Sequence, residues 1–66
     1  MNQTKQVIQD AVARGLKIEF LVGGEWIVAE PNSISFADKA VSFQDAATKA
    51  VYVVPLEGLV FRFSKV

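Results

Sequence analysis

The spacing of apolar residues changes once along the chain, after residue 15. Before that point, one helical stripe collects the apolar side chains Val7, Ile8, Ala11 and Val12. This spacing predicts a helix over residues 4–14. Asn2 or Thr4 is expected to cap its start, and Gly15 to end it. A helix of about three turns is marginal alone, so it must dock on the rest of the domain.

From residue 16 onward the apolar positions alternate with polar ones, which is the period of a half-buried strand. This pattern predicts five strands, at residues 16–22, 25–36, 40–44, 49–54 and 59–64. Gly23-Gly24 is a two-residue hairpin signal. Pro31 should bend the second strand and Pro55 should stop the fourth, because proline lacks the ladder N–H.

Short connections between all the strands favour an antiparallel meander that closes on itself. The predicted fold class is therefore mostly β: an N-terminal helix and a strongly bent, five-stranded, SH3-like barrel. A chain of 66 residues has room for one such domain, residues 1–66, with the barrel over about 16–65. We expect Trp26 in the core or against the helix, with an exposed stacking surface as the alternative.

Composition excludes several classes of protein. Apolar residues make up 52% and charged residues 21%, which does not fit a disordered chain. No apolar run approaches the roughly 20 residues that span a bilayer. Seven basic and seven acidic residues cancel, whereas a nucleic-acid-binding domain usually has a basic excess. The polar N-terminus has no signal-peptide core, so we expect a cytoplasmic protein.

The chemistry available to the chain is limited, because it contains neither His nor Cys. Glu25 and Glu30 flank the second strand without a neighbouring base, and they are expected to be solvated. We predict no catalytic residue, no metal site, no cofactor and no small-molecule substrate. A small domain without disulfide or metal commonly gains stability by oligomerisation, which the high apolar content suits.

A short helix followed by five strands resembles the Sm-like family, which includes the Hfq-like proteins. The best matching pieces are Leu21-Val22-Gly23-Gly24, Asp38 and the strand at residues 50–54. The segment Leu56-Glu57-Gly58, followed by Leu59 and Val60, is similar to the second Sm motif, in which Arg and Gly lie between aliphatic residues. The resemblance covers about residues 6–64.

The resemblance implies that the chain is a subunit of a homo-oligomeric ring. In this family the fourth strand of one subunit pairs with the fifth strand of its neighbour, which here joins residues 50–54 to residues 60–64. The expected interface residues are Val51, Tyr52, Val53, Val60, Phe61 and Arg62. The alternative is that both strands pack entirely within the core of one subunit.

The resemblance also implies a pocket for single-stranded RNA. Its positions fall on Asp38, Lys39, Ser42 and Gly58. Several positions depart from the family pattern. The stacking position falls at Ala40 or Val41, Ser42 stands where the family has Asn, and Glu57 stands where it has Arg.

The Hfq-type Lys-His pair is replaced by Val53-Val54. The pocket therefore lacks the family's own cations and aromatic ring, which single-strand binding uses, and Lys39 is its only obvious cation.

The first hypothesis is a non-enzymatic Sm-like ring subunit, an RNA-binding or RNA-chaperone relative with an atypical pocket. The alternative is a small β-barrel module for protein–protein interaction or structural assembly that does not bind RNA. An isolated SH3-like barrel of the WYL type ranks below both, because the WYL tripeptide is missing.

Overall fold

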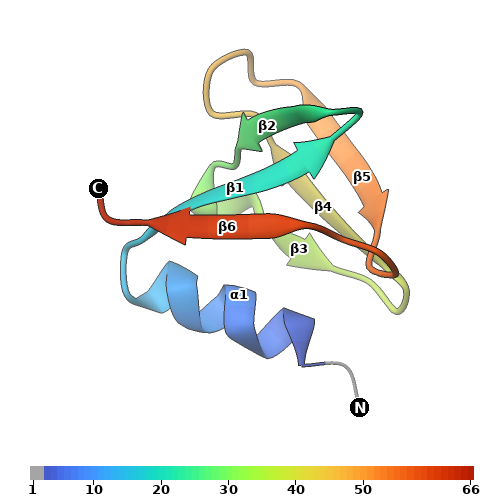
Figure 1. Cartoon of the computed structure of the whole chain (residues 1–66), viewed down its shortest axis with the longest axis horizontal. Coiled ribbons are helices and arrows are strands. Elements are labelled where there is room, and N and C mark those ends of the chain that lie inside the picture. Colours follow the sequence, from blue (N-terminus) through green and yellow to red (C-terminus); the bar gives the residue numbers. More distant parts are fainter. Residues whose placement is uncertain (1–2) are drawn as a thin grey trace.

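The computed structural model describes residues 3–66, which form an N-terminal helix followed by six strands (Figure 1). The elements are α1 (Thr4–Ala13), β1 (Lys17–Val22), β2 (Glu25–Val28), the 3-10 turn η1 (Pro31–Ser33), β3 (Ser35–Phe36), β4 (Ala40–Gln44), β5 (Val51–Pro55) and β6 (Phe61–Ser64). The prediction of a mostly β protein with a leading helix is confirmed.

The helix α1 agrees closely with its predicted range. Gln3 is the N-cap and makes no capping hydrogen bond through its side chain; Asn2 lies outside the described residues. At the other end, Gly15 adopts a φ of +71°, a conformation that glycine reaches without strain. The Leu16 N–H then donates to the Ala11 carbonyl at 3.1 Å, which turns the chain directly into β1.

The strands form two antiparallel sheets of three strands each, in the orders β2-β1-β6 and β3-β4-β5. The predicted second strand is two strands, because η1 interrupts it at Pro31, which has no N–H for a ladder. Ser33 compensates for the interruption. Its hydroxyl donates to the Glu30 carbonyl at 2.7 Å and accepts from the Gln44 N–H at 2.8 Å.

A short run of hydrogen bonds joins the two sheets where β2 ends. Ala29 forms a bridge with Asp45, and the Glu30 N–H donates to the Gln44 carbonyl at 2.8 Å. The sheets therefore act as one bent surface with β6 and β5 at its two edges. The predicted closure into a barrel is not found within residues 3–66, since β5 and β6 are not paired with each other.

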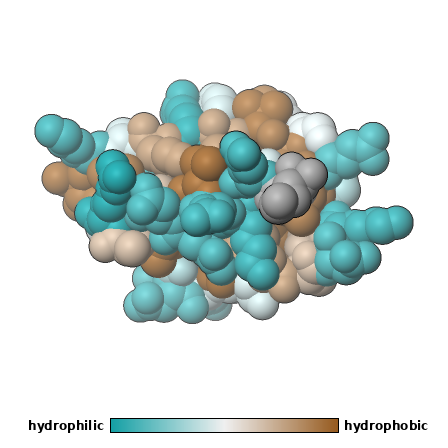
Figure 2. Space-filling model, turned by 90° about the horizontal axis from the view of Figure 1, so that it is seen from below, coloured by the Kyte–Doolittle hydropathy of each residue, from teal (hydrophilic) through white to brown (hydrophobic). Residues whose placement is uncertain are grey.

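The core lies between the two sheets and is covered at one end by α1 (Figure 1). Its buried members are Ile8, Ala11, Ile18, Phe20, Ala29, Val41 and Phe43. The rings of Phe20 and Phe43 lie 4.5 Å apart between their centroids and connect the two sheets. Seen from the helix side, the surface is mainly hydrophilic, with separate apolar patches (Figure 2).

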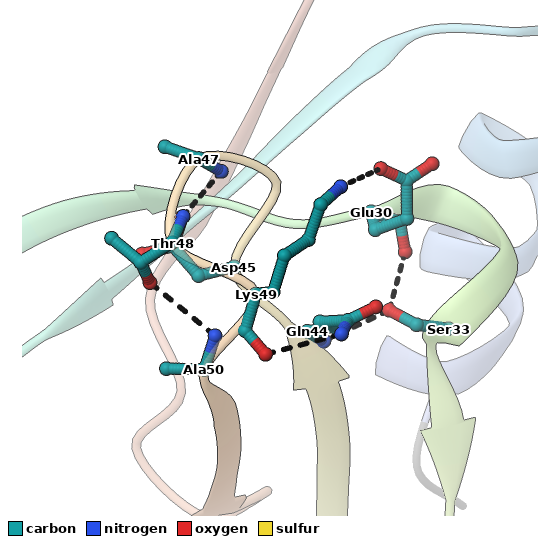
Figure 3. A network of polar contacts seen from close by, with 8 residues as sticks. All are labelled: Glu30, Ser33, Gln44, Asp45, Ala47, Thr48, Lys49 and Ala50. Carbon is teal, nitrogen blue, oxygen red and sulfur yellow. Dashed lines mark hydrogen bonds and ion pairs between the residues drawn. The ribbon is translucent and has the colours of Figure 1, made fainter.

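The loop between β4 and β5 is held by the Asp45 carboxylate, which accepts from the N–H groups of Ala47 at 2.8 Å and Thr48 at 3.3 Å (Figure 3). The hydrogen bond from Ala47 is the main reason that the pKa of Asp45 is lowered. Lys49 follows with a φ of +67°, and the Gln44 side-chain amide donates to its carbonyl at 3.1 Å. These contacts fix the point at which β5 begins.

Candidate functional site

Two turns come together at one end of the molecule and form a hollow. In the first turn, between β3 and β4, the Ala37 N–H donates to the Ala40 carbonyl at 2.8 Å. The second turn, between β5 and β6, is tied to the first because the Leu56 N–H donates to the Lys39 carbonyl at 2.9 Å. The hollow has a volume of about 680 Å³ and is lined by Asp38, Lys39, Pro55, Leu56 and Glu57.

The hollow contains part of the predicted RNA pocket. Asp38 and Lys39 line it, and Gly58 lies in the same turn as Glu57. Gly58 has a φ of +76°, which a residue with a Cβ would adopt only with strain. Ser42 does not line the hollow; it is partly buried in β4, opposite Val53.

The charges around the hollow do not suit a phosphate. Asp38 and Glu57 contribute two carboxylates against the single ammonium of Lys39, a formal charge of −1. All three residues are exposed. The hollow therefore contains two of the predicted pocket residues, Asp38 and Lys39, but its charge is the opposite of the one a phosphate needs.

The second candidate site is the open edge of β5. The Asp45 N–H donates to the Ala50 carbonyl at 2.8 Å, so alternate residues along β5 direct their backbone groups toward β4. The backbone groups of Val51 and Val53 point the other way, away from the sheet. Both valine side chains are 70% exposed, which is unusual for large apolar residues on an edge strand.

The open edge of β6 differs in one respect. The Leu21 N–H donates to the Val60 carbonyl at 2.9 Å, so the unpaired backbone groups belong to Phe61 and Phe63. Their side chains point into the core, where Phe61 lies 6.5 Å from Phe20. The free groups of β5 thus belong to residues that face outward, and those of β6 belong to residues that face inward.

The six predicted interface residues divide between the two faces. Val51, Val53 and Val60 are exposed. Tyr52 stacks on Phe43 at 5.5 Å and Phe61 packs against Phe20, so both belong to the partly buried core. Arg62 lies on the outer face of β6, opposite Glu19.

A cluster on the outer face of the β2-β1-β6 sheet was not predicted. Arg62 donates from Nε and Nη2 to the two oxygens of Glu19 at 3.0 and 3.1 Å. Its Cζ also lies 4.1 Å from the centroid of the Trp26 ring. The expectation that Trp26 lies in the core is wrong: the residue is 37% exposed and opposite Leu21, on the outward face of β1.

The ion pair has an electrostatic consequence for Glu19. The hydrogen bond from Arg62 lowers the pKa of this carboxyl, and that effect exceeds the opposing effect of desolvation. Glu19 is only 8% exposed, so the charged form of its carboxyl is stabilised by Arg62 and not by bulk water.

Comparisons with protein family models, with curated proteins and with solved structures found no match. No group of three or more metal-ligating side chains occurs within residues 3–66. Over the same residues, no helix is long and apolar enough to cross a membrane.

Proposed function

We propose that this protein is a non-enzymatic subunit of a closed homo-oligomer, an Sm-like ring in which β5 of one copy pairs with β6 of the next. The observation that carries the proposal is the pair of unpaired edge strands with opposite facing, described above. An exposed apolar edge invites pairing with another chain, and pairing would satisfy the free backbone groups of both edges.

The facing of the two edges supports pairing between different strands of two copies. Residues that share hydrogen bonds across an antiparallel pair have their side chains on the same face. Pairing β5 with the next copy's β6 would therefore place Val51 and Val53 on the same face as Phe61 and Phe63 of that copy. The two exposed valines of one copy would then extend the core of the next copy. In a β5–β5 pair, the valines of both copies would stay on the outer face.

The directions of the two edge strands explain why one copy does not close its own barrel. When β2 and β3 count as one bent strand, the sheet has an odd number of strands. Neighbouring strands alternate in direction, so β5 and β6 run the same way within one copy and could close the barrel only as a parallel pair, for which the connection at residues 56–60 is too short. We propose that the open Sm-like barrel is completed by a neighbouring copy.

Native mass spectrometry tests the assembly, with Val53→Lys as the decisive variant. A charge at this edge position should block pairing and give a folded monomer, since Val53 is 70% exposed and contributes little to the monomer core. Val7→Lys is the matched control, because Val7 is 44% exposed on α1 and distant in sequence from both edges. A wild-type monomer at micromolar concentration would exclude the ring.

The two functional hypotheses, an RNA-binding ring subunit and a protein-interaction or assembly module without RNA, differ in whether RNA binds at the hollow. Lys39 favours an RNA-binding relative, because it offers a cation beside the turn at Gly58. Asp38 and Glu57 favour an assembly or interaction module without RNA, because their carboxylates repel phosphate. The charge of the hollow makes the second hypothesis the better supported of the two.

A titration with labelled oligo-U and oligo-A at low and moderate salt decides between the two hypotheses. For RNA held in the hollow, Glu57→Arg should tighten binding about tenfold by replacing a repulsive charge with an attractive one, and Lys39→Ala should weaken it. If neither oligonucleotide binds at low salt, the interaction-module hypothesis stands. If RNA binds but neither Glu57→Arg nor Lys39→Ala changes its affinity, the hollow is excluded as the RNA site.

A further inference from the structure

The outer face of the β2-β1-β6 sheet presents a fixed pair of side chains, Trp26 and Arg62, the second of which is also among the predicted interface residues. Arg62 lies over the Trp26 ring at 4.1 Å, and Glu19 holds the guanidinium through two hydrogen bonds. The Arg62 side chain is 53% exposed although it is held on two sides. The pair is therefore ordered before any partner arrives, which lowers the entropic cost of binding.

The charge of this outer face is positive. Lys17 lies on the same side of β1 as Glu19, two residues away along the strand, and is exposed. Arg62 already neutralises Glu19, so the two cations and one carboxylate leave a formal charge of +1. Both bonds to Glu19 come from Nε and Nη2, which leaves the N–H groups of Nη1 for a second acceptor.

Apolar side chains lie beside the charged ones. Trp26 is 37% exposed and Val60 is 48% exposed, with the partly buried Leu21 between them in the strand register. Tryptophan and arginine are the residue types that most often dominate binding energy at protein interfaces. The surface thus offers apolar side chains next to the Arg62 guanidinium, and it is complementary to a ligand in which an apolar side chain lies next to a carboxylate.

We infer that this outer face is a docking surface for a protein segment that combines acidic and apolar side chains. The carboxylate binds at Nη1 of Arg62, and the neighbouring apolar side chain packs on Trp26 and Val60. A nucleic acid fits less well, because one uncompensated cation gives little phosphate affinity and the whole chain has no net charge.

Trp26 is the single tryptophan, so its fluorescence reports directly on this surface. The probe is a short capped peptide in which Glu and Phe alternate; a matched peptide carries Lys in place of Glu. The acidic peptide should give a saturable change in Trp26 emission, and the basic peptide should give none. Oligo-U is titrated in parallel to detect a nucleic-acid site.

Two variants test the geometry. Arg62→Lys keeps the charge but removes the planar guanidinium, which stacks on the Trp26 ring and forms two hydrogen bonds with a carboxylate. The peptide should therefore bind about tenfold more weakly. Lys39→Ala removes a cation at the hollow and should leave peptide binding unchanged. Circular dichroism checks the fold of each variant, and Trp26→Leu, followed by calorimetry, gives a second test should Arg62→Lys disturb the sheet.

Several results would overturn the inference. These are the absence of a saturable response to the acidic peptide, equal responses to both peptides, or a response that Arg62→Lys leaves unchanged. Tighter binding of oligo-U than of the peptide would assign the surface to nucleic acid. Dispersal of an oligomer by the peptide would show that a second copy occupies the surface. Because sizing measures assembly separately, failure of the docking surface and failure of the ring are distinguishable.

Discussion

Glu19 and Arg62 show how much a single residue's surroundings decide in this small domain. The two residues are 43 positions apart in the sequence and become opposite each other only when β6 pairs with β1. Neither would attract notice alone in an alternating strand. Together with Trp26 they make a connected cluster on the outer surface of their sheet.

The lowered pKa of Glu19 predicts a dependence of stability on pH. A carboxyl whose pKa is lower in the folded state stabilises the protein above its unfolded pKa, about 4.3 for Glu, and loses that contribution as the pH falls through the folded value. Glu19→Gln should therefore be less stable than the wild type at pH 7, and the difference should narrow below about pH 4. Urea unfolding at several pH values measures this difference in the free energy of unfolding.

Glu25→Gln is the control for this prediction, because Glu25 is an exposed carboxylate at the start of the neighbouring strand. It should change the unfolding curve little at any pH. A constant difference between Glu19→Gln and the wild type from pH 7 to pH 3 would contradict the linkage. Asp45, whose pKa is also lowered, should remain as a second source of acid sensitivity in both variants.

The position of Trp26 could have been predicted from two facts in the sequence. A two-residue turn at Gly23-Gly24 sets the register that places Trp26 opposite Leu21, and Leu21 alternates with the buried Phe20, so it lies on the outer face with Glu19. Hydrophobicity alone favoured the core, and that preference was misleading. The pairing of Glu19 with Arg62 had no such signal, since no turn sets the register of strands so far apart.

At the scale of elements, the helix and the strands could be predicted because their periodicities differ clearly. The range of β4 was predicted without error, and its two inward residues, Val41 and Phe43, are buried. The interruption between β2 and β3 was expected from Pro31, but the role of Ser33 in bonding Gln44 was not. That bond depends on a neighbouring strand, which a local pattern does not contain.

Pro55 has a different effect from the one predicted. It does not stop β5 but forms its last residue, opposite Ala40. The ladder alternation directs the backbone of position 55 toward the open edge, so the missing N–H costs no bond within the sheet. Pro55 therefore shortens the edge that is available to a partner.

Pro55→Val restores a donor at that position and should lengthen the pairing edge of β5. We expect tighter self-association than in the wild type, measured as a lower concentration for half-assembly in sedimentation experiments. Pro55→Gly is the control for loss of the proline side chain, because it restores the backbone N–H without adding apolar surface. Unchanged association in both variants would mean that β5 does not pair at this end.

At the scale of the whole molecule, the two unlike edges predict a head-to-tail arrangement of copies. A chain blocked at β5 by Val53→Lys and a chain blocked at β6 by Phe63→Pro, which removes an unpaired edge N–H without placing a charge in the core, each lack one edge. Mixed together they should form a one-to-one pair through the remaining β5 and β6 edges, whereas each alone stays monomeric. Native mass spectrometry of the mixture measures this, after circular dichroism has checked both folds.

Pairing between identical edges gives a different result. If copies join through β5 and β5, the Phe63→Pro chain alone forms dimers, because its β5 is intact. If they join through β6 and β6, the Val53→Lys chain alone does so. Either outcome contradicts the head-to-tail arrangement and the ring with it.

The odd number of strands in the bent sheet gives each copy two unlike ends, and this makes any assembly directional. A row of copies joined end to end always keeps one free β5 and one free β6, however many copies it contains. Addition of further copies therefore never exhausts the binding sites. Growth stops only when the curvature at each joint brings the last copy back to the first, so the angle between neighbours separates a finite ring from an unlimited fibre.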